Sequence, residues 1–325
     1  MRPITRQYYI LNMQFRPYCN SMRVGNCVIE RVEDYDSKQT LLSNRIKFHG
    51  AEFSGTPTTG QNTVTGTLTW TVAEPPSNSV LLGASNTAID DIVILLRLFT
   101  GREVAYATPE AMEDENLLGL HLDHRQYGFG KVIRTSIPYV KGPNLCPSGL
   151  KWKDESVEAI LNKLLATISD KEWLDVYHNG AFLGLLEQAI KQRTITSAFT
   201  QCWTIWEHLF FCLNCKWMSE QIIRKTRAEE KIAFILQRHG ILYDIDKKCR
   251  DVIQRLVNTR NRLVHHGLFP DTSEAIADAQ LFVDLTEYVA VKAMNLIPGE
   301  VFNTLEQAII LFSKGETFYH RDMQA

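Results

Sequence analysis

The sequence predicts an α+β protein, with a β-rich domain over residues 1–145 followed by an all-α domain over residues 152–325. Short segments rich in β-branched and aromatic residues, separated by turn-forming runs, dominate the first domain. In the second domain, apolar residues recur every three or four positions, as they do on one face of a helix, and no convincing strand remains. The stretch 141–149 holds two prolines and two glycines, so the domain boundary is expected there.

Three segments of the first domain have strand character: 7–14, 26–33 and 63–72. The last alternates between polar and apolar residues for much of its length, which predicts one buried face. A further strand pair is expected within 132–140. A single helix interrupts the strands, because Ser85 or Asn86 can cap it, 89–99 supplies an apolar face, and Gly101 can end it.

The second domain is expected to contain six or seven helices, read from capping residues and apolar periodicity. They are expected over 154–168, 170–186, 196–213, 219–240, 244–266 and 271–293, with a seventh over 300–312. The segment 196–213 is apolar nearly all round, which is typical of a central buried helix. Gly267 follows the fifth helix as its C-terminal stop.

Composition and cysteine usage favour a cytoplasmic globular protein with no cofactor and no metal. Hydrophobic residues make up 45% and charged residues 22% of the chain, which argues against disorder. Arginines interrupt the first 20 residues, so no secretory signal is expected, and no run reaches the roughly 18 apolar residues of a membrane span. Cys212 and Cys215 form a lone C-x-x-C, which favours buried thiols over a zinc site. The pair His121 and His124 is an equally weak metal candidate.

The net charge of −2 hides an uneven distribution. Residues 201–270 contain 12 Lys and Arg against 7 Asp and Glu, a local charge of +5. Residues 271–325 contain 3 against 9, a local charge of −6. The basic segment is either a surface that faces a polyanion or one of two helix faces that pair with each other, and charge alone leaves both open.

One arginine of the fifth helix stands among apolar positions. Arg260 lies four residues after Leu256 and four before Val264, in the middle of the apolar stripe. Because burial of a guanidinium without a partner is expensive, a carboxylate or a phosphate must meet it.

Two polar side chains follow Arg260 on the same helix. His265 lies one turn after Asn261, so Asn261 can orient the imidazole. His265 also lies in the last helical turn, where the helix dipole favours the protonated ring. An arginine that holds a phosphodiester and a histidine that moves a proton are a workable minimum for RNA cleavage.

These residues also have a purely structural interpretation. Arg260 can be one member of a buried ion pair, with Glu207 on the third helix as its partner, and a histidine at a helix end is often a cap. Spacing alone does not decide between the two interpretations.

The segment Arg260-Asn261-Arg262-Leu263-Val264-His265 resembles the R-N-x-x-x-H form of the R-x4-H motif of HEPN ribonucleases. Its setting is similar too: a helix of the form Phe199-x3-Trp203-x2-Trp206-Glu207-x-Leu209 precedes it, and Gly267 and a long helix over 273–293 follow. The resemblance covers about half of the chain and implies a HEPN-like helical bundle.

Carried over by position, the resemblance implies that Arg260 and His265 are catalytic and that Asn261 is their polar neighbour. Glu207 would be an accessory orienting or ion-pair residue, and His266 a second imidazole of unassigned role. HEPN domains pair so that two motifs share one site, which implies a homodimer. The implied activity is metal-independent cleavage of RNA, either tRNA or mRNA, through attack by the 2′-hydroxyl.

The whole chain also resembles ApeA-type abortive-infection proteins, in which a β-rich domain precedes a HEPN domain. The segment 90–104, a helix that ends in Thr-Gly-Arg-Glu-Val, carries this resemblance. It implies a role in defence against phage, with a phage-derived trigger sensed by the first domain.

Two other functions are retained as alternatives. The helical domain could be a non-catalytic HEPN scaffold that dimerises or binds RNA. The first domain could instead be the active part, a β-domain that binds a ligand, although the sequence shows no constellation of acids, histidines or glycines there that supports chemistry.

Overall fold

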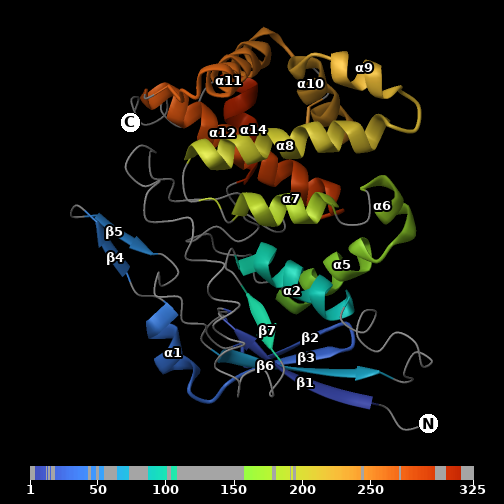
Figure 1. Cartoon of the computed structure of the whole chain (residues 1–325), viewed down its shortest axis with the longest axis vertical. Coiled ribbons are helices and arrows are strands. Elements are labelled where there is room, and N and C mark those ends of the chain that lie inside the picture. The colour runs from blue at the N-terminus through green and yellow to red at the C-terminus, as the bar shows by residue number, and fades with distance from the viewer. Residues whose placement is uncertain are drawn as a thin grey trace. The chain divides into compact units, whose positions relative to one another are not determined.

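The computed structural model describes residues 4–11, 13, 15, 19–42, 45–48, 51–54, 64–72, 87–100, 104–107, 157–177, 181–190, 192, 195–242, 245–270, 272–296 and 305–315 (Figure 1). The chain forms two compact units. The first comprises Met1–Thr135 and Glu155–Leu165, and the second comprises Ser136–Asp154 and Ala166–Ala325. The expected strand pair at 132–140, the expected boundary at 141–149, and His121 and His124 all lie outside the described residues.

A five-stranded antiparallel sheet forms the centre of the first unit, with the strand order β2-β3-β6-β1-β7. Its strands are β1 (Ile4–Leu11), β2 (Ser21–Val24), β3 (Cys27–Arg31), β6 (Val64–Val72) and β7 (Ala105–Ala107). Tyr8, Met22, Ile29 and Leu68 face one another across four neighbouring strands, and all four are buried. One face of the sheet is therefore core, as the alternation in the sequence predicted.

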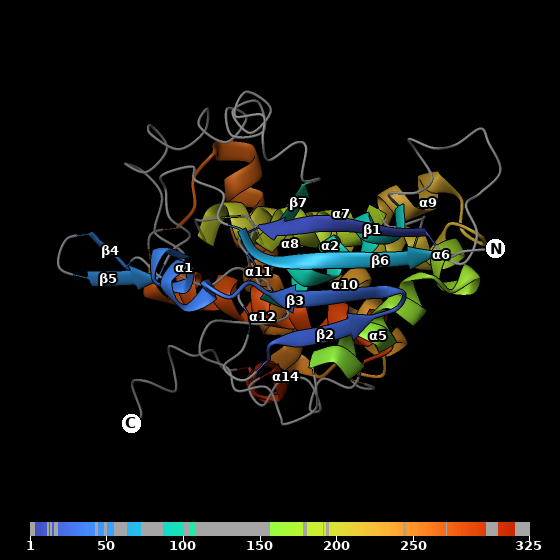
Figure 2. The same cartoon turned by 90° about the horizontal axis from the view of Figure 1, so that it is seen from below.

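Helices cover that face. Figure 2 shows α2 (Thr87–Thr100) and the first part of α5 (Val157–Ile168) behind the strands. Residues at helical spacing on α2 are fully buried: Ile89, Ile92, Val93, Leu95, Leu96 and Leu98. A short helix, α1 (Tyr35–Leu42), and a separate hairpin, β4 (Arg45–Phe48) with β5 (Ala51–Ser54), complete the described part of the unit.

The edge strand β2 is held by side chains of α5. The backbone N–H of Arg23 donates to Glu158 Oε2 (2.9 Å) and that of Gly25 donates to Asn162 Oδ1 (2.8 Å). Asn162 Nδ2 donates in return to the carbonyl of Arg23 (2.7 Å). Since these bonds replace those that a further strand would make, α5 closes this edge of the sheet. The sequence had placed every residue from 152 onward in the helical domain, whereas α5 belongs to the first unit as far as Leu165.

The described part of the second unit consists of helices and their connections and contains no strand. Its helices are α6 (Lys171–Val176), α7 (Ala181–Ile190), α8 (Ile195–Asn214), α9 (Glu220–Lys225), α10 (Ala228–Arg238), α11 (Lys247–His266), α12 (Ser273–Ala293) and α14 (Leu305–Lys314). The central helix α8 packs against α7, α10 and α12, while α11 packs against α10, α12 and α14. Phe282 of α12 contacts the rings of Phe199, Trp203 and Trp206 on α8, which makes an aromatic core.

The fold class is thus α+β, with an antiparallel sheet in the N-terminal region and helices after it. The strands expected over 26–33 and 63–72, the helix expected over 89–99 and the helices α8, α11 and α12 are confirmed, while the strand expected over 7–14 begins and ends three residues earlier, as β1. Asp170, Ser219 and Asp246 cap helices, because each side chain accepts a hydrogen bond from the backbone N–H of the third residue beyond it.

Three expectations are wrong. The first unit contains α1 as well as α2, so its described part has more than a single helix. The segment 170–186 holds two helices, α6 and α7, and the sequence between them contains Asn179-Gly180, both poor helix formers. The segment 219–240 is also divided, because Thr226 and Arg227 are extended and Arg227 starts α10 with its backbone N–H bonded to Glu230.

One buried histidine makes the stability of the second unit depend on pH. His239 ends α10, its Nε2 atom is buried without a hydrogen-bond partner among the described residues, and burial, helped by the charges of Arg238 and Lys292, lowers its pKa from 6.5 to about 4. Between these values the unfolded chain binds a proton that the folded chain does not, so stability falls as the pH falls.

We expect this group to reduce the free energy of unfolding by about 2 kcal/mol between pH 7 and pH 5. Urea unfolding of the wild type and of His239→Gln at both pH values measures this. The free energy of unfolding of the wild type, minus that of His239→Gln, should fall by about that amount between pH 7 and pH 5. A difference that does not change with pH would contradict the prediction.

Candidate functional site

The candidate motif lies in the last two turns of α11, which begins after Asp246 and ends at Gly267, the stop that the sequence predicted. Asp246 Oδ1 accepts from the backbone N–H of Cys249 (2.9 Å) at the start of the helix. Gly267 ends it in the left-handed region, at φ 65°, and its N–H donates to the carbonyl of Leu263 (2.9 Å). A side chain with a Cβ is disfavoured at this φ, which explains the glycine.

Arg255 anchors α11 against α12. Its Nε and Nη2 atoms donate to the two carboxylate oxygens of Asp278, both at 2.9 Å, and the Asp278 side chain is only 3% exposed. Such a bidentate pair satisfies both charges and fixes the position of the helix. This pair was not a candidate in the sequence, although an arginine lies on the fifth expected helix and an acidic residue on the one that follows.

Arg260 lies on the side of α11 that faces α8. Its guanidinium carbon is 5.5 Å from the centre of the Trp203 ring, and its Nη2 atom is 3.9 Å from Glu207 Oε1. Both side chains of this ion pair are 35% exposed. Since 3.9 Å is too long for a hydrogen bond, and no described residue accepts one from this guanidinium, Arg260 keeps donors available for another anion.

Glu207 is held more closely by Lys231 of α10. Lys231 Nζ donates to Glu207 Oε2, lies 5.6 Å from the centre of the Phe210 ring, and belongs to a side chain that is only 9% exposed. One carboxylate therefore stands between two cations, and the group Lys231–Glu207–Arg260 has a net charge of +1. Lys231 was not a candidate in the sequence, although its place four residues before the buried Ile235 marks it as a charge on an apolar face.

His265 and Asn261 lie on another side of α11. His265 is exposed and Asn261 half-buried, and no hydrogen bond joins these two described residues, so the expected orientation of the imidazole by Asn261 is absent. His266 is also exposed, with its ring centre 6.5 Å from that of His265. Arg260 and His265 are five residues apart, which places them about 140° apart around a helix.

Two exposed apolar side chains accompany the motif. Val264 is 60% exposed and Leu268 is 59% exposed, although both belong to the stretch that carries Arg260 and His265. The predicted apolar stripe of α11 is therefore core as far as Val257 and accessible surface at Val264.

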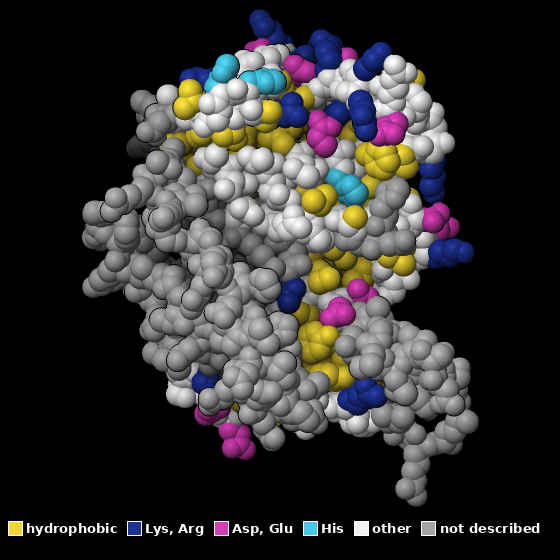
Figure 3. All heavy atoms as spheres, viewed as in Figure 1, with side chains coloured by type: hydrophobic (Ala, Val, Ile, Leu, Met, Phe, Trp, Pro, Cys, Tyr) yellow, Lys and Arg dark blue, Asp and Glu magenta, His cyan; other side chains and the backbone are white. Residues whose placement is uncertain are grey.

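The cations of the basic segment 201–270 are of two kinds: some pair with carboxylates of the helical unit, and others form no such pair with a described residue. Lys231, Arg255 and Arg260 pair with carboxylates inside the helical unit. Figure 3 shows a group of Lys and Arg side chains at the top of the visible face, where α9, α10 and α11 lie in Figure 1. Six lysines and arginines of these three helices form no ion pair with any described residue: Lys225, Arg238, Lys247, Lys248, Arg250 and Arg262.

The described residues contain no group of three or more His, Cys, Asp and Glu side chains that could hold a metal ion. Of the C-x-x-C pair, Cys212 is buried and Cys215 half-buried, and burial raises the pKa of the Cys212 thiol to about 12. Cys212 Sγ lies 3.3 Å from Nε2 of His208. None of the described helices is long and apolar enough to cross a membrane.

No protein-family model matches the chain, and neither the curated proteins nor the solved structures contain a significant match.

The group around Glu207 supports a stability prediction. We expect Glu207→Gln to reduce the free energy of unfolding by about 2 kcal/mol, because it leaves the nearly buried Lys231 ammonium without a charge partner. Urea unfolding measures the effect.

Glu220→Gln is the matched control, since Glu220 pairs with Arg224 at an exposed position on α9. Its loss should stay within about 0.5 kcal/mol. Equal losses for the two variants would show that Glu207 contributes no more than a surface pair.

Proposed function

We propose that this protein is a HEPN-type endoribonuclease that cleaves RNA without a metal, through attack by the RNA's own 2′-hydroxyl, with Arg260 and His265 as its catalytic residues. The main observation in support is the environment of Arg260. Its guanidinium lies over the Trp203 ring and near the carboxylate of Glu207, which already pairs with Lys231. A guanidinium in this position lies against an aromatic ring and can still donate hydrogen bonds to a phosphate.

The proposed reaction transfers one phosphoryl centre within the RNA. The 2′-oxygen attacks phosphorus and its proton passes to the neutral imidazole of His265, while the bond from phosphorus to the 5′-oxygen breaks. The departing 5′-oxygen takes a proton from a second imidazolium or from water. Arg260 stabilises the charge on the non-bridging oxygens, and the products carry a 2′,3′-cyclic phosphate and a 5′-hydroxyl.

A second copy of the chain fits this chemistry. Because Arg260 and His265 point about 140° apart on one helix, a single α11 presents them poorly to one phosphate. The exposed Val264 and Leu268 supply apolar surface beside the motif, which supports a homodimer through this end of α11. The two motifs would then form one composite site.

The cellular role that we propose is abortive infection of phage-infected bacteria, with the first unit responding to a phage-derived trigger. It rests on the likeness of 90–104 to ApeA-type proteins. Part of that segment has a structural role as well, since Arg97 Nε donates to the carbonyl of Val104 (2.5 Å) and closes the end of α2.

A non-catalytic HEPN scaffold is the second candidate, and the geometry around Asn261 favours it. His265 has no hydrogen bond from Asn261 that would fix its tautomer, and Arg260 has Glu207 within 4 Å. The same end of α11 would then dimerise or bind RNA without cleaving it.

Cleavage of end-labelled tRNA and mRNA in the presence of EDTA tests the proposal. The wild type should cut and leave 2′,3′-cyclic phosphate ends, while Arg260→Ala/His265→Ala should lose at least about 100-fold in rate. The proteins are compared at matched dimer content, with the exposed Arg224→Ala on α9 as a control that should cleave like the wild type.

Equal cleavage by the wild type and the double variant would contradict the assignment of these two residues. If neither protein cuts, expression in cells separates the candidates. Toxicity of the wild type that the double variant lacks supports a nuclease that needs a trigger, and equal growth of both strains favours the scaffold.

A further inference from the structure

The solvent face of α11 is a continuous polar stripe that begins at His265. Side chains at helical spacing along it are Lys247, Arg250, Gln254, Asn258, Arg262 and His265, and all of them are exposed. Gln254 Nε2 donates to Asn258 Oδ1 (3.1 Å), so the two amides lie end to end on the helix. From Lys247 to His265 the stripe is about 27 Å long.

Cations and amides dominate this stripe. All residues of α11 are described, and Asp251 is the sole carboxylate on its solvent face. Asp251 interacts with Arg255: the pKa of the Arg255 guanidinium is raised, chiefly by its hydrogen bonds to Asp278 and also by the negative charge of Asp251. Lys247, Arg250 and Arg262 keep their charges unpaired among the described residues. Unpaired cations on either side of two amide groups suit the phosphates and sugar hydroxyls of a single RNA strand.

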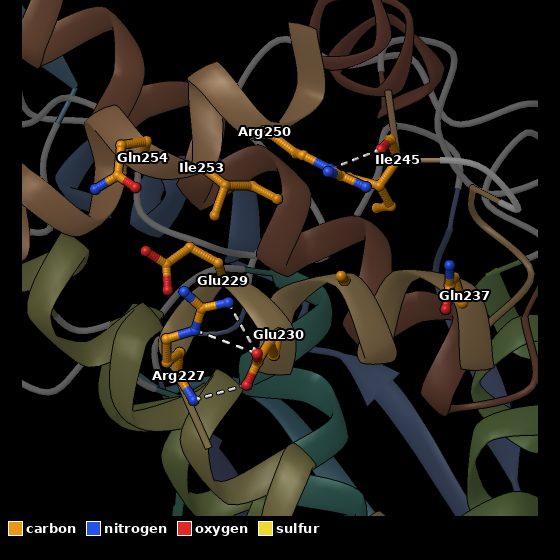
Figure 4. Close-up of a pocket in the computed structure, with 9 residues that line it drawn as sticks. Arg227, Glu229, Glu230, Gln237, Ile245, Arg250, Ile253 and Gln254 are labelled. Atoms are coloured by element: carbon orange, nitrogen blue, oxygen red, sulfur yellow. Dashed lines mark hydrogen bonds and ion pairs between the residues drawn. The ribbon is translucent and has the colours of Figure 1, made fainter. Parts of the chain in front are cut away.

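The stripe leads into a pocket of about 470 Å³ between α10 and α11. Arg250, Ile253 and Gln254 line it from α11, and Figure 4 shows Glu229 and Gln237 facing the same space from α10. The volume is in the range of small-molecule sites and is large enough for a nucleobase. Gln254 belongs to the pocket and to the stripe, so the two surfaces are continuous.

The lining of the pocket combines an apolar wall with donors and acceptors. Ile245 and Ile253 are buried and offer an apolar surface to a base. The Glu229 carboxylate can accept from an exocyclic amine, and the Gln237 and Gln254 amides can both donate and accept. The guanidinium of Arg227 is occupied, since its Nε and Nη2 atoms donate to Glu230 Oε1 (3.2 and 3.0 Å).

Arg250 is placed for a phosphate. Its Nε atom donates to the carbonyl of Ile245 (3.1 Å), which fixes the stem of the side chain, as Figure 4 shows. Its Nη atoms have no hydrogen-bond partner among the residues that the structure describes. A guanidinium fixed through Nε and open at both Nη atoms can donate two parallel bonds to phosphate oxygens.

We infer that the solvent face of α11 is a track for single-stranded RNA, along which the strand runs from the scissile phosphate at His265 to the α10–α11 pocket. The pocket receives one nucleobase, and Arg250 binds the phosphate of that nucleotide. This inference rests on the proposed function for the position of the scissile phosphate, but the track itself is a binding site that exists with or without cleavage.

The test measures binding in a chain that cannot cleave. Fluorescence anisotropy of a labelled 12-nucleotide single-stranded RNA is measured with full-length His265→Ala as the host protein. In this host, Arg250→Ala/Gln254→Ala should raise the Kd about tenfold. The slope of log Kd against log salt concentration should fall by about 1, because one contact with a phosphate is lost. Arg224→Ala removes one exposed arginine of α9 outside the track and should change the Kd less than about twofold.

A second variant guards against an effect on folding. Gln254→Glu adds a negative charge at an exposed position of the same stripe, and we expect it to weaken binding while the melting temperature stays that of the host protein. The inference is overturned if the double variant binds within twofold of the host, if Arg224→Ala weakens binding equally, or if the host binds no RNA.

The failure of this inference can be told from failure of the proposed function. If the wild type cleaves RNA and the track variants bind RNA as well as the host does, the track is contradicted and the nuclease function is supported. If binding depends on the track residues but the wild type never cleaves RNA, the track is supported and the scaffold is favoured.

Discussion

The carboxylate of Glu207 is the interaction on which the candidate site depends. It stands on the central helix α8 and meets Lys231 of α10 and Arg260 of α11, so one side chain ties three helices together. Burial of a charged group costs free energy unless a charge of opposite sign pairs with it. The partly buried Glu207 carboxylate and the nearly buried Lys231 ammonium therefore each require the other. The position of Arg260 follows from this mutual requirement and from the Trp203 ring on which the guanidinium lies.

A comparison of two arginines on the same helix shows what this arrangement leaves open. Arg255 donates two bonds of 2.9 Å to Asp278, and its charge is fully matched within the helical unit. Arg260 shares its carboxylate with Lys231 and approaches it only to 3.9 Å. A purely structural ion pair would gain by adopting the geometry of Arg255. The looser pairing of Arg260, together with its partial exposure, is better suited to exchange one anion for another.

The sequence predicts the helices that carry long apolar stripes and clear caps, and it predicts the strands that alternate. It also predicts that Arg260 requires a partner, a carboxylate or a phosphate, and it offers Glu207 as an available carboxylate. Short elements such as β2 and the hairpin of β4 and β5 escape prediction, since their stability comes from pairing and not from their own four residues. The division of 170–186 and 219–240 into two helices each, the role of Asn162 at the sheet edge, and the burial of Lys231 depend on contacts with distant residues, which periodicity does not encode.

The angle between Arg260 and His265 connects assembly to chemistry. Five residues turn a helix by about 140°, so one α11 presents its guanidinium toward α8 and its imidazole to solvent. Two copies that meet through Val264 and Leu268 would bring both kinds of group to one place, while a single copy would offer an arginine without its proton-transfer partner. A catalyst of this kind would require that interface, and so would a scaffold that dimerises; these two differ only in what His265 does once the interface has formed. For that reason an inactive monomer argues for neither function, and the behaviour of His265 in the assembled protein is the property that separates them.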